Sequence, residues 1–241
     1  DVTPRQIGEA VEHHEGAAFV GAFGEADEAA RVESYGAHRS GVYGTFAPMP
    51  RLVLASSSKY RAALLARAGI ACEAIAPEVD ERAVARSGLS PREVAETLAC
   101  MKAEDVAAKV PDAFVLGGDQ LVELDGEILG KPGSFEAALA QLGRLAGKEH
   151  RLVTAIALRR PSGEIDVEVD VHRLRMRALS REEMERVLLA DEPYDCAGSY
   201  KIERRGVLLF ESIEGRDFTA IEGVPLMALG RLLRAAGFAA P

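Results

Sequence analysis

The chain has 241 residues and a formal charge of −9, with 29 basic against 38 acidic side chains. This acidic excess excludes nucleic-acid binding through a broad basic surface. No apolar run approaches the roughly 20 residues that cross a bilayer, and the N-terminal segment lacks the basic start and apolar block of a secretory signal. We therefore expect a cytoplasmic protein with no membrane partner.

Residues 1–48 differ in composition from the rest of the chain. They carry three arginines against eight acidic side chains, and their apolar residues hold no period beyond a couple of helical turns. We expect a poorly ordered extension or a short ancillary helix there, followed by one folded domain over residues 49–241.

From residue 51 the chain alternates between strand-like and helix-like segments. The expected strands are 51–55, 71–76, 114–117, 121–124, 127–129, 151–158, 165–177 and 207–213. The expected helices are 59–68, 90–108, 135–146, a helix capped by Ser180, and 225–236. This alternation, with a hairpin at Asp125-Gly126, indicates an α/β fold with a mixed sheet.

The expected strand 165–177 alternates regularly. Its apolar positions are Ile165, Val167, Val169 and Val171, and the polar positions between them are Asp166, Glu168, Asp170 and His172. The alternation predicts that the polar set forms a solvated sheet face and not a cation site.

Several nucleotide and hydrolase motifs are absent. Gly130-Lys131 is followed by Pro132 in place of the hydroxyl residue that a P-loop needs, and no G-x-G-x-x-G follows a strand. The H-E-x-x-H and G-x-S-x-G patterns are missing too, which argues against zinc proteases and serine hydrolases.

Charged residues at turns and strand ends suggest a phosphate site. Ser56, Ser57 and Ser58 open a helix whose dipole favours phosphate oxygens, and Arg61 lies one turn into it. Asp119 follows Gly117-Gly118 at the end of an apolar strand, where open α/β sheets bind ligands. The acidic residues Glu78, Asp80 and Glu81 crowd one loop, and the remaining cations considered are Lys102 and Lys131. Together they combine carboxylates for a divalent metal with cations for phosphates.

Five motifs carry a family resemblance. They are residues 52–65, Pro77-Glu-Val-Asp-Glu81, Gly117-Gly-Asp-Gln120, Gly130-Lys-Pro132 and Cys196-Ala-Gly-Ser-Tyr-Lys-Ile-Glu203. In order and spacing they resemble the Maf family of nucleoside triphosphate pyrophosphatases, and residues 209–225 resemble the branch that acts on 7-methyl-GTP.

The resemblance implies a Maf/ITPase-like fold, with a long twisted mixed sheet flanked by helices and two lobes around a cleft. It also implies hydrolysis of the α–β phosphate bond of a small nucleotide, with Mg²⁺ or Mn²⁺ as cofactor. A homodimer is the oligomeric state that we consider for this protein.

The same resemblance assigns roles residue by residue. Phosphate binding falls on Ser56 and Arg61, to which the serine turn adds Ser58. The catalytic set is Asp119, Glu81, Lys102 and Lys131. We expect Asp119 to activate the attacking water and Glu81 to hold the metal, although either carboxylate could serve either role. The cations would stabilise charge on the phosphates.

Base specificity is expected at Tyr60, Gln120 and Glu203, which differ between branches of the family. Because 7-methylguanine is positively charged, an aromatic face at Tyr60 and a carboxylate at Glu203 favour it. The expected product is 7-methyl-GMP with pyrophosphate, which removes a modified nucleotide. The alternatives are a dTTP/UTP pyrophosphatase, a metal-dependent phosphomonoesterase, or a non-catalytic nucleotide-binding regulator of cell division.

Overall fold

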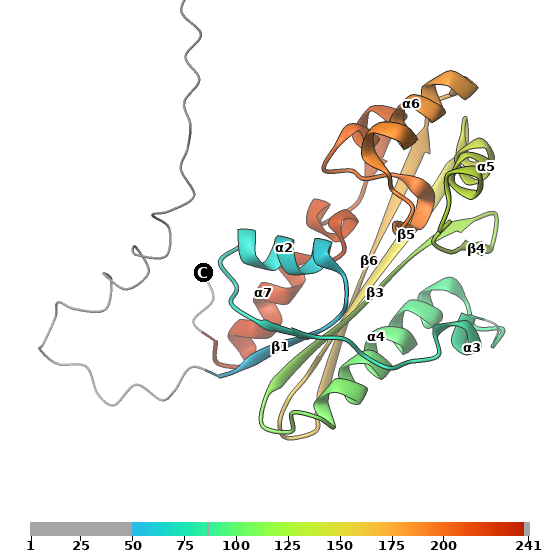
Figure 1. Cartoon of the computed structure of the whole chain (residues 1–241). Helices are drawn as coiled ribbons and strands as arrows, with labels where there is room; N and C mark the ends of the chain where they lie inside the picture. The colour runs from blue at the N-terminus through green and yellow to red at the C-terminus, as the bar shows by residue number, and fades with distance from the viewer. Residues whose placement is uncertain (1–49, 86, 239–241) are drawn as a thin grey trace, which may run out of the picture. The chain divides into compact units, whose positions relative to one another are not determined.

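The computed structural model describes residues 50–85 and 87–238 (Figure 1), so the expected extension at residues 1–48 lies outside the described residues. Seven strands in this part form one sheet: β1 (Leu52–Ala55), β2 (Glu73–Ile75), β3 (Phe114–Leu124), β4 (Glu127–Leu129), β5 (Glu149–Arg159), β6 (Ile165–Met176) and β7 (Phe210–Glu214). The order is β2-β1-β3-β5-β6-β7, with β4 also paired to β3. Strand β1 is parallel to β2 and β3, and the other pairings are antiparallel, which confirms the α/β class with a mixed sheet.

Six α-helices and three 3₁₀ helices accompany the sheet in the described residues. They are α2 (Lys59–Arg67), α3 (Glu81–Ala85), α4 (Pro91–Ala107), α5 (Phe135–Leu145), α6 (Arg181–Asp191) and α7 (Leu226–Ala235), with η1 (Ala197–Ser199), η2 (Arg205–Leu209) and η3 (Phe218–Glu222). Ser90 and Ser180 start α4 and α6 through capping boxes, as their sequences predict. No helix of this part is long and apolar enough to cross a membrane.

Helices cover both faces of the sheet around β1. Figure 1 shows α4 on one side of the strands and α2 with α7 on the other. Within β1, Val53 and Ala55 join the core under α4, whereas Leu52 and Leu54 join the core under α2 and α7. This two-sided burial explains why the segment is continuously apolar and does not alternate.

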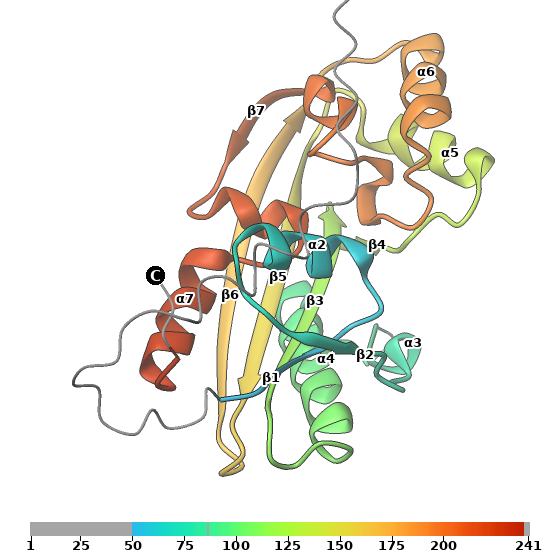
Figure 2. The same ribbon diagram turned by 60° about the vertical axis from the view of Figure 1, so that its left-hand side comes forward.

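A separate core forms at the other end of the long strands. There α5 and α6 lie beside the upper part of the sheet (Figure 2). Their Leu142 and Leu188 side chains join Val122, Leu152 and Leu174 of the sheet in one buried cluster. The described residues therefore form two lobes that share strands β3, β5 and β6.

Strand β3 differs from its prediction. It runs without a break through Gly118, Asp119 and Gln120, so Asp119 lies inside a strand and not at the end of one. On one edge, however, β1 pairs with β3 only as far as Gly117, and β4 pairs only from Val122 onward. Residues 118–121 thus have no strand partner on that edge. The space beside them takes the place of the ligand-binding space that was expected at a strand end.

The predicted solvated face of β6 is wrong at two positions. Asp170 and His172 are only 4% and 2% exposed, whereas Val167 and Val171 are 40% and 37% exposed. The segment after β7 covers this face: a side chain at Gly215 would lie 2.2 Å from the His172 ring. The predicted strand 207–213 is also shorter, because residues 207–209 belong to η2 and β7 begins at Phe210.

Candidate active site

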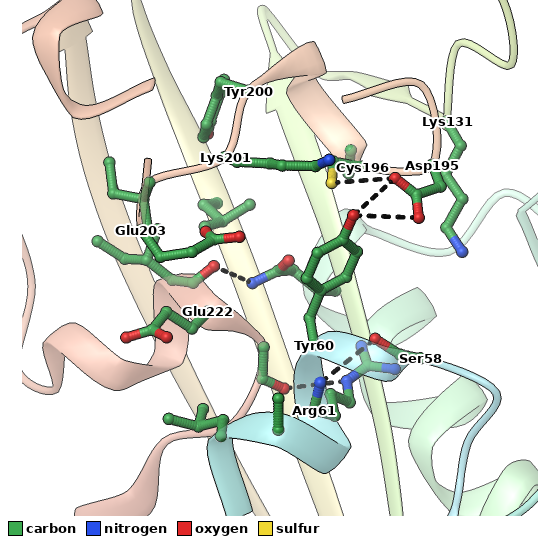
Figure 3. Close-up of a pocket in the computed structure, with 18 of the residues that line it drawn as sticks. Ser58, Tyr60, Arg61, Lys131, Asp195, Cys196, Tyr200, Lys201, Glu203 and Glu222 are labelled. Carbon is green, nitrogen blue, oxygen red and sulfur yellow. Dashed lines mark hydrogen bonds between the residues drawn. The ribbon is translucent and has the colours of Figure 1, made fainter. Parts of the chain in front are cut away.

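Two pockets adjoin at the uncovered edge of β3. The carboxylate pocket, of about 430 Å³, is lined among others by Glu81, Lys102, Asp119 and Leu121. The aromatic pocket, of about 150 Å³, is lined among others by Tyr60, Asp195, Tyr200, Lys201 and Glu203 (Figure 3). Both pockets are also lined by Arg61, Gln120, Lys131 and Ala197. The structure therefore gathers nearly all the predicted site residues around one place.

Lys102 holds the two carboxylates of the carboxylate pocket together. Its Nζ atom lies 2.6 Å from Glu81 Oε1 and 2.7 Å from Asp119 Oδ1. Both Lys102 and Asp119 are almost fully buried, and a buried charge requires such a partner.

Gly117 allows this contact, because helix α4 passes directly over it. A Cβ atom at Gly117 would lie 2.1 Å from the carbonyl oxygen of Ala99 and 2.8 Å from the backbone nitrogen of Ala103. Without a side chain there, α4 packs close enough for Lys102 to reach Asp119.

Only one acid of the crowded loop reaches the pocket. Glu78 pairs with Lys109, and Asp80 Oδ1 accepts hydrogen bonds from the backbone N–H groups of Arg82 and Ala83 in α3. Glu81 begins α3 and lines the pocket. Partial burial raises the pKa of Glu81, but the hydrogen bond and charge of Lys102, with the charges of Lys131 and Arg61, lower it by more. The net pKa is lowered, so Glu81 is ionised at neutral pH.

Arg61 is fixed from two sides. Its Nε donates to the carbonyl oxygen of Gly223 at 3.0 Å, and its Nη1 donates to Ser56 Oγ at 3.3 Å. Burial lowers the pKa of Arg61, and the facing carboxylates of Asp119 and Glu81 oppose that shift. The guanidinium thus faces the carboxylate pocket in a fixed orientation.

The predicted phosphate-binding serines have structural partners. Ser58 caps α2 by accepting a hydrogen bond from the Arg61 backbone N–H, and it lines the aromatic pocket. Ser56 lies behind Arg61, where its hydroxyl oxygen accepts from Arg61 and from the Ser58 backbone. Since Ser56 lines neither pocket, direct contact between Ser56 and phosphate stays a prediction.

The predicted base-specificity residues line the aromatic pocket together. Gln120 donates its amide Nε2 to Ala220 O at 2.8 Å, Ile221 O at 3.0 Å and Thr154 Oγ1 at 3.1 Å. These bonds engage the amide nitrogen within the protein, so the side-chain oxygen of Gln120 is the atom suited to a ligand.

Sequence reasoning missed four charged residues of the aromatic pocket: Arg67, Asp195, Lys201 and Glu222. Lys201 is buried, and its Nζ donates to the carbonyl oxygens of Asp191 and Glu192 at the end of α6. A signal was available for Lys201 and Asp195, because the Cys196–Glu203 motif contains the first and directly follows the second.

The carboxylate pocket offers oxygen donors that suit Mg²⁺ or Mn²⁺. Lys102 contacts one oxygen of Glu81 and one of Asp119, which leaves the second oxygen of each carboxylate for a hard cation. In the described part of the chain no group of three or more His, Cys, Asp or Glu side chains could hold a metal ion. A cation held by these two carboxylates therefore needs further oxygens from water and substrate phosphates.

The fold is α/β with a mixed sheet. Two carboxylates, two lysines and an arginine gather at the uncovered edge of one strand, and such a site is equipped to bind a polyphosphate. A family model described as Maf-like protein matches residues 51–236. The chain belongs to the Maf family.

Relatives of this chain are similar over nearly the whole described part. The 7-methyl-GTP pyrophosphatase of Xanthomonas axonopodis pv. citri is 48% identical over 193 residues, which is 80% of this chain and 100% of the relative. The protein of the same name from Bdellovibrio bacteriovorus is 45% identical over 77% of this chain and 97% of its own length. Among solved structures, a nucleoside-triphosphatase / dITP/XTP pyrophosphatase from Mycobacterium abscessus aligns with a TM-score of 0.36 and 21% identity, over 54% of this chain and 75% of its own.

Proposed function

We propose that this protein is a cytoplasmic, metal-dependent nucleoside triphosphate pyrophosphatase that hydrolyses the α–β bond of 7-methyl-GTP to 7-methyl-GMP and pyrophosphate. The observation that carries the proposal is the pair of adjoining pockets that share Arg61, Gln120 and Lys131. One pocket contains cations and carboxylates suited to a triphosphate, and the other contains an aromatic ring and a carboxylate suited to a base.

The charged side chains have distinct tasks in this reaction. Arg61, Lys102 and Lys131 stabilise negative charge on the phosphates and on the departing pyrophosphate. Asp119 accepts the proton of the attacking water, and Glu81 holds the cation, with the reverse division between the two carboxylates kept as the alternative. A divalent cation bound here neutralises phosphate charge and acidifies its bound water.

The aromatic pocket supports the choice of base. Methylation at N7 gives the guanine ring a positive charge, and the face of Tyr60 attracts cations. Glu203 lines the same pocket and adds a carboxylate. The names of the relatives at 48% and 45% identity are consistent with this choice.

A substrate panel with product identification tests the proposal. The full chain is incubated with Mg²⁺ or Mn²⁺ and with 7-methyl-GTP, GTP, dTTP or UTP, and both pyrophosphate and orthophosphate are measured. We expect pyrophosphate to be released fastest from 7-methyl-GTP. Equal or faster turnover of dTTP or UTP would reject the base assignment. Orthophosphate as the first product would indicate a phosphomonoesterase, and binding without turnover would indicate a regulator.

A further inference from the structure

The hydroxyl of Tyr60 and the carboxylate of Asp195, which both line the aromatic pocket, form a hydrogen bond. Tyr60 Oη donates to Asp195 Oδ1 at 3.0 Å, and Oδ2 lies 3.2 Å away (Figure 3). Tyr60 belongs to α2, and Asp195 lies 135 residues further along the chain, between α6 and η1. The contact therefore joins the two lobes and fixes the orientation of the ring.

The Asp195 carboxylate is ionised in this contact. Partial burial raises its pKa, but hydrogen bonds from Tyr60 and Lys59 and the charge of Lys59 lower it by more. Tyr60 stays protonated, because burial first, and then the neighbouring Cys196 and Asp195, raise its pKa. A neutral phenol that donates to a carboxylate gains negative charge on its oxygen and ring, which strengthens the attraction of the ring face for a cation.

Cations already lie near the ring. Lys59 Nζ is 5.0 Å and Lys201 Nζ is 5.5 Å from the ring centre. Lys201 is held by the end of α6, whereas the Lys59 side chain is 72% exposed and ion-paired to Asp195 at 3.3 Å. Both distances lie within the range of cation–π attraction, so the Tyr60 ring is placed where cations gather.

We propose that Asp195 is a specificity-determining positioning residue, which orients the Tyr60 ring and raises its attraction for the positively charged base of the substrate. This inference rests on the proposed function, because it assumes a nucleotide base in the aromatic pocket. Asp195 acts through Tyr60 and does not itself need to touch the base.

A double-mutant cycle tests the coupling between these residues. The variants are Asp195→Asn, which removes the charge and keeps the shape, Tyr60→Phe, which removes the hydroxyl and keeps the ring, and their combination. We expect Asp195→Asn to lower kcat/KM for 7-methyl-GTP about tenfold, mainly by raising KM. For GTP, whose base is uncharged, kcat/KM should fall by no more than about threefold. Tyr60→Phe should act similarly, and the double variant should be no worse than either single variant.

Asp112→Asn is the matched control, because Asp112 is 79% exposed and lines neither pocket. Equal losses for 7-methyl-GTP and GTP, or additive effects of the two substitutions, would overturn the proposal.

Binding without turnover separates this proposal from the proposed function. Calorimetric affinities for 7-methyl-GMP and GMP are measured for the wild type and for Asp195→Asn. If the wild type releases no pyrophosphate but prefers 7-methyl-GMP in an Asp195-dependent way, the proposed function fails and the role of Asp195 stands. A wild-type preference for 7-methyl-GMP that Asp195→Asn leaves unchanged, or no preference at all, overturns the role of Asp195.

Discussion

Nζ of Lys102 on helix α4 lies 2.7 Å from Oδ1 of Asp119 on strand β3, and both side chains are almost fully buried. The same ammonium lies 2.6 Å from Glu81. One cation therefore keeps close together two carboxylates that would otherwise repel each other. In the proposed function, this arrangement keeps negative charge available for a divalent cation and for the attacking water.

Asp119→Asn should abolish most turnover while the protein stays folded. The amide cannot accept a proton from water, so we expect kcat for the preferred nucleotide to fall about 10² to 10⁴-fold. Lys102 keeps Glu81 as a partner in this variant, so the far-ultraviolet circular dichroism spectrum should match that of the wild type. Asp112→Asn serves again as the control, and residual activity above one third of wild type would remove Asp119 from the catalytic set.

Glu81→Gln should weaken the response to divalent cations. Because one carboxylate oxygen donor is lost, we expect the Mg²⁺ concentration for half-maximal activity to rise about tenfold or more. Glu78→Gln, three residues earlier, changes an 84% exposed acid that pairs with Lys109 and should leave the Mg²⁺ titration unchanged. Superimposable titrations for wild type and Glu81→Gln would argue that Glu81 does not hold the cation.

Gly117→Ala should destabilise the fold more than Gly118→Ala. The new Cβ atom at residue 117 would meet the α4 backbone at 2.1 Å, whereas at residue 118 its nearest neighbour would be Arg61 Nε at 3.4 Å. We expect Gly117→Ala to lower the unfolding free energy by about 1 to 3 kcal/mol and Gly118→Ala by less than about 1 kcal/mol. Urea unfolding of the two variants measures both values, and equal losses would contradict the close approach of α4.

Stability should decrease as the pH falls from 6.5 to 4, partly because of His150. Burial lowers the pKa of His150 from 6.5 to about 4. Between these values the unfolded chain binds a proton that the folded chain does not, so acidification favours unfolding, by up to about 3 kcal/mol from this residue. This destabilisation by His150 is complete at pH 4 and absent above pH 6.5.

His150→Phe should flatten this pH dependence, measured as unfolding free energy at several pH values. Tyr200→Phe is the control, because it removes the same 3.1 Å contact with His150 Nε2 but keeps the imidazole. It should shift stability by a constant amount and keep the slope. His172, whose pKa burial also lowers, titrates in every variant. An unchanged slope in His150→Phe would contradict the assignment.

Local signals in the sequence predicted the helix starts, because a capping box needs only residues within one turn. Ser90 and Glu93 made α4 predictable, and the strand expected over residues 51–55 was recognisable from the continuous apolar run Leu52–Ala55. The extent of β3 was not predictable in this way. Whether a strand continues through Gly117-Gly118 depends on its pairing with Ala157 and Ile156 of β5, which lie 40 and 38 residues further along the chain.

The face of β6 shows the same limit. Its alternation is real, but which set of side chains is buried depends on what packs against each face. Gly215 and the residues around it cover Asp170 and His172, and no pattern within residues 165–176 encodes that cover.

The sequence by itself determined the residue types of the site, the α/β class and the family, since motifs in their order are properties of the chain alone. Only the tertiary structure decided which charges act together. Glu78 and Glu81 are chemically identical, but only Glu81 reaches Lys102. The role proposed for Asp195 depends on its hydrogen bond with Tyr60, which lies in the other lobe. Such pairings depend on long-range packing, which sets the direction and burial of each side chain, and burial makes a charge depend on its partner.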